Sequence, residues 1–184
     1  RISFLIFIVV LGIESARQTV ARLKKGRRVE ELEQFALNDS MTGMYNRNAY
    51  DYFVKNEKDF EGYVIVTFDL NNLKQCNDQY GHRAGDEYII NAAHIIEDNF
   101  ERYGKCYRIG GDEFCCIIPK GRYFKIERVM HKINQDVEIL NHKNIIPVPV
   151  GIAYGYAVFT ADDMDPEKVR ERADEDMYRN KKAM

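Results

Sequence analysis

Three acidic residues stand where predicted strands begin or end, and they are the first candidates for chemistry. Asp69 closes the apolar run YVIVTFDL, and Asp112 and Glu113 directly follow two glycines. If the two strands are neighbours, the three carboxylates converge, and like charges at such close range repel unless a cation joins them. Mg²⁺ prefers a few carboxylate oxygens together with substrate phosphates. The pattern therefore predicts a divalent-metal site.

These acids have two other interpretations. An isolated Asp-Glu pair is usually a polar turn, but the two glycines and Asp69 favour a site. A calcium-binding loop that starts at Asp69 would need an oxygen ligand, a glycine and a glutamate where the sequence has Leu73, Lys74 and Tyr80. The calcium loop is therefore excluded.

The elements that must position these acids alternate between helix and strand. Residues 105–109 and 114–118 read as strands joined through Gly110-Gly111, and we expect a tight turn with positive φ at these glycines. The sequence predicts helices over 46–58, 84–100, 126–140 and 166–182, and further strands over 63–70 and 147–159. This order predicts an α/β (α+β) layer structure, with a sheet of about five strands flanked by helices.

The N-terminus has a different character from the rest of the chain. Residues 2–13 are almost wholly apolar and would form about 18 Å of helix, less than the roughly 30 Å of a bilayer core. Basic residues follow, as on the cytoplasmic side of a membrane helix. We expect residues 1–13 to be the end of a transmembrane helix and 14–37 to be a long linker or signalling helix. A buried or amphipathic helix at 2–13 is the alternative, and residues 14–37 could simply be a solvated helix.

The composition is that of a globular protein, with 45% hydrophobic and 30% charged residues in 184. Residues 1–28 hold seven of the 27 Lys and Arg residues and one of the 29 acids, so the other 156 residues carry a net charge of −8. Such an acidic body is not expected to bind nucleic acid. The four cysteines form no CxxC pair, which favours a reduced, cytosolic setting and argues against zinc.

The motifs of residues 38–184 resemble those of the GGDEF family, the bacterial diguanylate cyclase domains. The signature is similar to RIGGDEF at 108–114, and the entry motif to DSMTGM at 39–44 followed by Asn46-Arg47. A second block is similar to DLNNLK at 69–74 with Asn77-Asp78, Gly81-His82 and Gly85-Asp86, and a C-terminal block to Ala173-Asp174 with Tyr178 and Lys181. Four blocks in order over about 145 residues make the resemblance specific.

The resemblance implies that two GTP molecules condense to cyclic di-3′,5′-GMP with release of two pyrophosphates. It also implies a nucleotidyl-cyclase-like fold, Mg²⁺ or Mn²⁺ with two ions per active site, and a homodimer in which two sites face each other. With the N-terminal segment, it implies a bacterial cell-membrane protein whose catalytic domain lies on the cytoplasmic side. A catalytically silent domain that binds GTP or cyclic di-GMP is the alternative, and an unrelated interaction domain is a third.

The resemblance also assigns roles to the acids and to the residues that would hold the nucleotide. Asp69, Glu113 and the Leu70 carbonyl would bind the metal, and Asp112 would act as general base or share the metal. Lys74 and Lys181 would neutralise phosphates. The residues left to contact the rest of the nucleotide are Asn77 and Asp86 on guanine, His82 beside the base or ribose, and Gly110 and Gly111 where the backbone approaches.

Several of these residues have ordinary structural alternatives. Asn77 and Asp86 could be helix caps, His82 a turn residue, and Lys181 a solvated lysine at a helix end. Arg108 is left out of the site as structural. The family's inhibitory RxxD motif is replaced by Glu101 to Gly104, ERYG, so feedback by product at that motif is not expected.

Overall fold

The computed structural model describes residues 17, 36–121, 125–163 and 165–183. The predicted membrane segment lies outside these residues, as does the predicted linker helix apart from residues 17, 36 and 37. No helix within the described ranges is long and apolar enough to cross a bilayer. The chain divides into two units between Leu37 and Asn38, and the fold below is that of the second unit.

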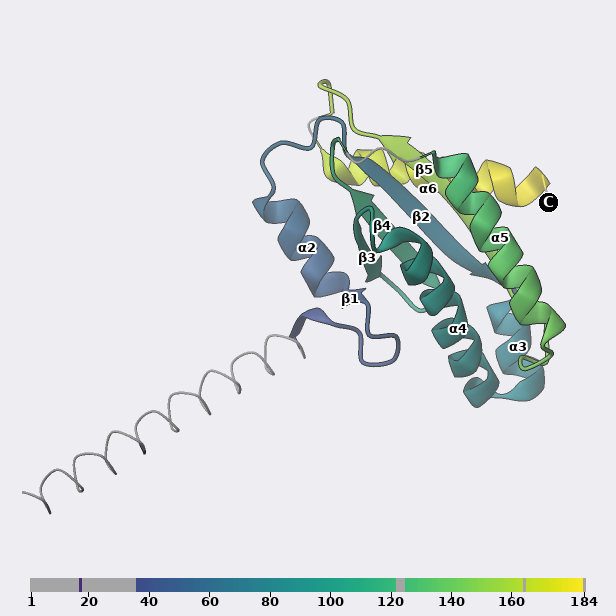
Figure 1. Ribbon diagram of the computed structural model, residues 1–184. Coiled ribbons are helices and arrows are strands. Elements are labelled where there is room, and N and C mark those ends of the chain that lie inside the picture. Colours follow the sequence, from purple (N-terminus) through teal and green to yellow (C-terminus); the bar gives the residue numbers. More distant parts are fainter. Residues whose placement is uncertain (1–16, 18–35, 122–124, 164, 184) are drawn as a thin grey trace, which may run out of the picture. The chain divides into compact units, whose positions relative to one another are not determined.

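A five-stranded sheet forms the centre of this unit (Figure 1). Its order is β1-β3-β4-β2-β5, with β1 parallel to β3 and the other neighbours antiparallel. The strands are β1 (Tyr45–Asn46), β2 (Val64–Asn71), β3 (Lys105–Arg108), β4 (Glu113–Ile118) and β5 (Gly151–Val158). The helices are α2 (Arg47–Asn56), α3 (Leu73–Tyr80), α4 (His82–Phe100), α5 (Ile126–His142) and α6 (Pro166–Ala183). The predicted fold class and the number of strands are confirmed.

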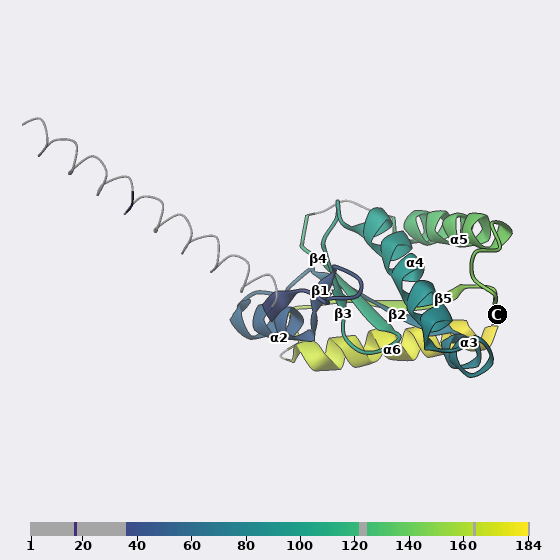
Figure 2. The same ribbon diagram turned by 90° about the horizontal axis from the view of Figure 1, so that it is seen from below.

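Helices cover both faces of the sheet, with α4 and α5 on one face and α6 on the other (Figure 2). Successive side chains of a strand point to opposite faces. In β2, Val66, Phe68 and Leu70 belong to the core beneath α4 and α5, whereas Asp69 points toward α6, where it meets Lys181. Asp69, two residues before the end of β2, therefore lies on the α6 face.

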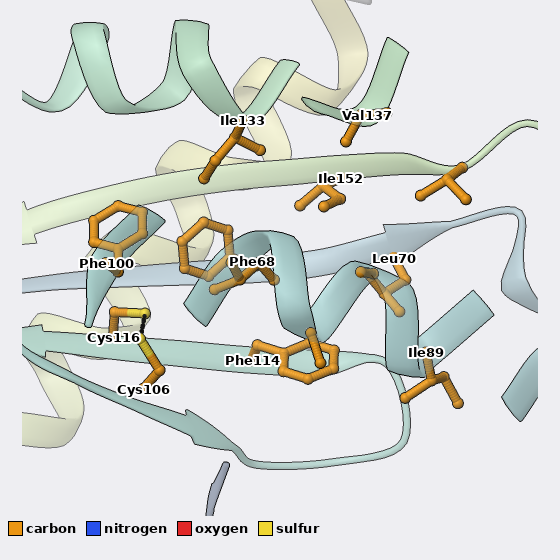
Figure 3. Packing of buried hydrophobic residues seen from close by; sticks show 14 of the residues in the cluster. Phe68, Leu70, Ile89, Phe100, Cys106, Phe114, Cys116, Ile133, Val137 and Ile152 are labelled. Atoms are coloured by element: carbon orange, nitrogen blue, oxygen red, sulfur yellow. Dashed lines mark hydrogen bonds between the residues drawn. The ribbon is translucent and has the colours of Figure 1, made fainter. Parts of the chain in front are cut away.

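The main core lies between the sheet and helices α4 and α5 (Figure 3). Phe68 of β2 and Phe100 of α4 are both 1% exposed or less and pack edge to face with their ring centroids 5.5 Å apart. Cys106 and Cys116 are register partners on β3 and β4, and their Sγ atoms lie 2.9 Å apart. This apolar layer fixes β2 and β4 as the two rigid strands from which Asp69 and Glu113 project.

The structure differs from the predictions in four places. The two-residue strand β1 was not predicted, because Asn46 was expected to begin a helix. Leu73–Tyr80 forms a separate helix that was not predicted, and the helix predicted over 84–100 begins at His82. β5 begins at Gly151 instead of 147. The β3–β4 hairpin is confirmed, but its turn is not the tight type expected, because neither Gly110 nor Gly111 has a positive φ. The loop spans the four residues 109–112, a length that does not require positive φ at the glycines.

Candidate active site

Asp69 and Glu113 lie directly opposite each other on the two central antiparallel strands. Opposed residues of neighbouring strands project to the same face, with Cβ atoms about 4.5–5.5 Å apart, so both carboxylates face α6. The residues next to this pair are also hydrogen-bonded to each other, since the Leu70 N–H donates to the Asp112 carbonyl at 3.1 Å. The predicted neighbourhood of the two strands is therefore confirmed.

The three acids do not form a compact cluster of carboxylates. Among the described residues, no group of three or more His, Cys, Asp and Glu side chains is arranged to hold a metal ion. Instead, the ammonium of Lys181 on α6 forms an ion pair with Asp69. A cation beside paired acids relieves their repulsion, and this lysine supplies it.

Arg108 organises the glycine loop between β3 and β4. Its guanidinium donates to the carbonyls of Gly110 at 3.2 Å and Gly111 at 2.9 Å, and to the Asp39 carboxylate at 3.0 Å. A Cβ at Gly110 would lie 3.3 Å from Glu113 Oε2, whereas a Cβ at Gly111 would meet nothing within 4 Å. Arg108 thus connects the loop to the segment before β1 by hydrogen bonds. The space beside Gly111 is open.

Asp39 is itself held in place from two sides. Its Oδ1 accepts from Arg108 and from both the backbone and the hydroxyl of Thr42. Burial raises the pKa of the Asp39 carboxyl, but the hydrogen bonds from Arg108 and Thr42 outweigh this and leave the pKa below its ordinary value. Arg108 thus has the structural role expected of it, and has it at the site itself.

A second group of candidate residues lies on α3 and α4. Asn77 is inside α3 and Asp86 is inside α4, so neither caps a helix, and the capping alternative is wrong for both. A Cβ at Gly85 would fall 2.0 Å from Asn77 Oδ1. The missing side chain at Gly85 therefore lets Asn77 lie against α4 next to Asp86.

The other two candidates of this group are exposed. Lys74 stands on the first turn of α3, and His82 is the first residue of α4, after Gly81 with its φ of 83°. His82 is therefore a helix-start residue, and its neighbour Gly81 carries the turn. Both side chains are open to a ligand bound beside α3 and α4.

Tyr88 joins α4 to the sheet close to these groups. This fully buried side chain donates its hydroxyl to the Asn71 carbonyl at 2.6 Å and accepts from the Gly151 N–H at 2.7 Å. Burial raises the pKa of Tyr88 to about 12, so the hydroxyl keeps its proton and remains a donor. The bond connects the helix of Asp86 to the strand end that follows Asp69.

The donor set fits a hard divalent ion that shares its coordination with a substrate. Mg²⁺ is commonly bound by one or two carboxylates while phosphate oxygens and water complete its shell. Asp69 and Glu113 are opposed on rigid strands, and the Lys181 ammonium at Asp69 marks a position where a positive charge is favoured.

A large cavity lies away from these residues. About 1100 Å³ opens between α4 and α5, lined by residues such as Asn91, Arg128 and Asp136 and by none of the predicted site residues. A smaller space of about 200 Å³ lies on the α6 face beside Glu113, Asp174 and Met177. We assign the candidate site by the convergence of charged groups, since a site completed by a nucleotide and ions need not be a deep cavity in the protein alone.

The five-stranded sheet with helices on both faces, and acids at the adjoining ends of its central strands, define a cyclase-like domain. Residues 36–184 match the model of the family described as "Diguanylate cyclase, GGDEF domain". The chain therefore belongs to the GGDEF family of diguanylate cyclase domains.

Two curated relatives are bacterial proteins of greater length. The bifunctional diguanylate cyclase/cyclic di-GMP phosphodiesterase MucR of Pseudomonas aeruginosa is 30% identical over 175 residues, which cover 90% of this chain and 25% of MucR. The diguanylate cyclase DgcS of Shewanella oneidensis is 28% identical over 160 residues, which cover 83% of this chain and 52% of DgcS. The chain thus spans between a quarter and about half of these relatives.

Solved structures share the fold. The coiled coil and GGDEF domain of DgcB from Caulobacter crescentus, in complex with c-di-GMP, matches with a TM-score of 0.76 and 23% identity, over 94% of this chain and 95% of that one. The diguanylate cyclase SiaD of Pseudomonas aeruginosa, solved with its activator SiaC, matches with a TM-score of 0.69 and 22% identity, over 92% and 72%. At these identities the likeness concerns the fold.

Proposed function

We propose that this domain is an active diguanylate cyclase that condenses two GTP molecules into cyclic di-3′,5′-GMP and two pyrophosphates. The observation that carries the proposal is the opposed pair Asp69 and Glu113, with Lys181 at Asp69 and the Gly110-Gly111 loop beside it. Membership of the GGDEF family supports the same chemistry. Phosphoryl transfer depends mainly on positioning and charge stabilisation, which such a set of groups supplies.

The acids are proposed to hold the metal together with the GTP phosphates. Asp69, Glu113 and the Leu70 carbonyl would bind Mg²⁺ or Mn²⁺, up to two ions per site, and the ion would withdraw charge from the reacting phosphate. Asp112 would accept the proton of the attacking 3′-hydroxyl or share the metal. Lys181 and Lys74 would then pair with phosphate oxygens.

The guanine base is proposed to bind between α3 and α4. The Asn77 amide would donate to and the Asp86 carboxylate would accept from the edge of the base, and His82 would lie beside the base or ribose. The close approach of Asn77 to Gly85 supports this, because Gly85 directly precedes Asp86 in α4. Adenine would leave these polar groups unpaired, which is costly.

Catalysis would require two copies of the domain, because each supplies one GTP to a product that contains two. We propose that residues 14–37 form a linker helix; the coiled coil that the DgcB structure contains beside its domain supports this proposal. We further propose that residues 1–13 are the end of a membrane helix, on the strength of their apolar run and the basic residues that follow.

The assay incubates the full chain with GTP and Mg²⁺ and measures cyclic di-GMP by mass spectrometry. Product from the wild type, and none from Glu113→Ala, would support the proposal. Glu175→Ala is the control, because this exposed acid lies on α6 away from the pair. Binding of GTP or cyclic di-GMP without turnover would identify a silent regulatory domain instead, and an absence of both would leave an interaction domain.

A further inference from the structure

Three side chains of α6, spaced four residues apart, bond to alternate residues of β5. The bonds run from Arg172 Nη2 to the Val158 carbonyl (3.0 Å), from the Tyr156 N–H to Asp176 Oδ2 (3.2 Å), and from Asn180 Nδ2 to the Tyr154 carbonyl (3.2 Å). We call these three side chains the α6 clamp. Since β5 is an edge strand, paired with β2 on one side, the clamp satisfies three backbone groups of its free side.

The geometry of helix and strand makes this pattern repeat. Four residues of an α-helix rise about 6.0 Å, and two residues of an antiparallel strand about 6.8 Å, so the steps nearly match. The helix numbering rises as the strand numbering falls, which gives an antiparallel arrangement. Gly155 permits the close approach, because a Cβ there would lie 2.1 Å from Met177 N and 2.2 Å from the Ala173 carbonyl.

The last clamp bond lies at the same level of the sheet as the ion pair of the candidate site. Asn180 bonds to Tyr154, and the next helix residue, Lys181, pairs with Asp69. The register partner of Asp69 on β5 is Ala153, the neighbour of Tyr154. A side chain one residue further along an α-helix is rotated by about 100°, so the direction of Lys181 depends on how α6 is turned over β5.

We propose that Asp176 and Asn180 are positioning residues that fix this rotation and thereby deliver the Lys181 ammonium to Asp69. The part of the inference that concerns GTP rests on the proposed function, since Lys181 would there neutralise phosphates. Arg172 anchors the first half of α6 and also forms a bidentate ion pair with Asp163. The test therefore changes only the two residues nearest to Lys181.

The variants separate the clamp from the general stability of α6. Asp176→Ala/Asn180→Ala removes both bonds, together with the ion pair between Arg179 and Asp176 at 3.4 Å, and retains a residue with high helix propensity. Asp176→Asn in the wild-type background keeps an oxygen acceptor for the Tyr156 N–H and should behave as the wild type. Glu175→Ala removes an acid from the exposed side of the same helix and is the matched control.

Two measurements test the clamp without any nucleotide. Hydrogen exchange of the Tyr156 amide should accelerate about tenfold in the double variant, since its acceptor is gone. Acylation of Lys181 by an amine-reactive ester, quantified against the exposed Lys168 of the same helix, should also accelerate several-fold. Unchanged rates at both sites, in a double variant that is folded, would overturn the inference.

The kinetic measurement tests the consequence for the substrate. Loss of phosphate positioning should raise the KM for GTP about fivefold, the effect expected for about one lost hydrogen bond, and leave kcat within about twofold. A role confined to structure would reduce the active fraction and thus kcat, with KM unchanged, and would contradict the proposal. If the wild type itself makes no cyclic di-GMP, the proposed function fails, while exchange and acylation still decide whether the clamp orients Lys181.

Discussion

The ammonium of Lys181 is paired with the carboxylate of Asp69, which lies 112 residues earlier in the chain. The pair joins the end of α6 to the end of the central strand β2. Because Asp69 is also a proposed metal ligand, the lysine occupies the position of a cation before any ion or nucleotide binds. When a metal ion and GTP bind as proposed, the Lys181 ammonium would leave Asp69 and pair with the phosphates.

This exchange predicts opposite effects of Lys181→Met on two ligands. Mn²⁺ alone should bind up to about fivefold more tightly, because removing a competing surface ion pair is worth at most about 1 kcal/mol. GTP should bind about tenfold more weakly, because a phosphate loses a charged partner, a contact worth about 1.5 kcal/mol or more.

Titration calorimetry measures both affinities, with Lys168→Met as the control on the exposed side of α6. If the affinities for Mn²⁺ and for GTP both fell, Lys181 would not compete with the metal.

The Arg108–Asp39 pair predicts a pH-dependent contribution to stability. Asp39→Asn should lower the free energy of unfolding at pH 7 by about 1–2 kcal/mol, as for loss of a hydrogen bond to a charged group. The pKa of Asp39 is lower in the folded than in the unfolded state, so the unfolded chain takes up the proton first and acid favours unfolding. The stabilisation is complete above the unfolded-state value of about 3.9 and is lost as pH falls toward the folded-state value.

Urea unfolding of the wild type and Asp39→Asn between pH 3 and pH 7 measures this effect. The difference between the two proteins should shrink as the pH falls below about 4. A constant difference across this range would mean that the carboxylate charge contributes nothing. Asp59→Asn is a control, since Asp59 is exposed.

Tyr88→Phe should destabilise the domain although it removes a single oxygen. The Asn71 carbonyl and the Gly151 N–H would both lose the buried Tyr88 hydroxyl as their partner. The expected cost is about 1–3 kcal/mol. For this chain length 1 kcal/mol corresponds to roughly 2–4 °C in Tm. Thermal unfolding measures the shift, and Tyr52→Phe, at a side chain 67% exposed, should change Tm little.

Gly155→Ala should be among the most disruptive small substitutions on the α6 face. The new Cβ would overlap backbone atoms of α6 at 2.1 and 2.2 Å, so the helix must move, at a cost of about 1–3 kcal/mol or more.

Gly151→Ala is the matched control on the same strand, because its Cβ would meet only the Asn71 side chain, at 3.3 Å. Equal stability of the two variants, measured in urea, would mean that α6 does not pack as closely as described.

The sequence predicted the elements with strong periodicity and missed those without it. The apolar run of β2 and the stripe of α4 were sufficient for a correct prediction, because burial on known faces determines them. α3 was missed because only Leu73 and Cys76 of its eight residues are buried, and its N-cap Asn72 forms no side-chain cap bond. Such a short helix depends on packing against α4, which the local sequence does not encode.

In the site, too, local patterns were predicted and contacts between distant residues were not. The acids and glycines were recognisable by their spacing, but the role of Arg108 depends on Asp39, 69 residues away, and no local pattern reveals that partner. The α6 clamp has the same origin, since its bonds join residues whose spacing of four on the helix has meaning only beside a strand. Contacts between distant segments are therefore what the sequence alone left open.

The central position of β2 has a consequence during protein synthesis. β2 is flanked by β4 and β5, which follow it roughly 40 and 80 residues later in the chain. At about 5–20 residues per second, both edges of this apolar strand are unpaired for about 2–8 s until β4 emerges, and one edge for about 4–16 s until β5 emerges. In that interval the unpaired apolar strand can associate with other chains, so β2 is a segment of the nascent chain that a chaperone would protect.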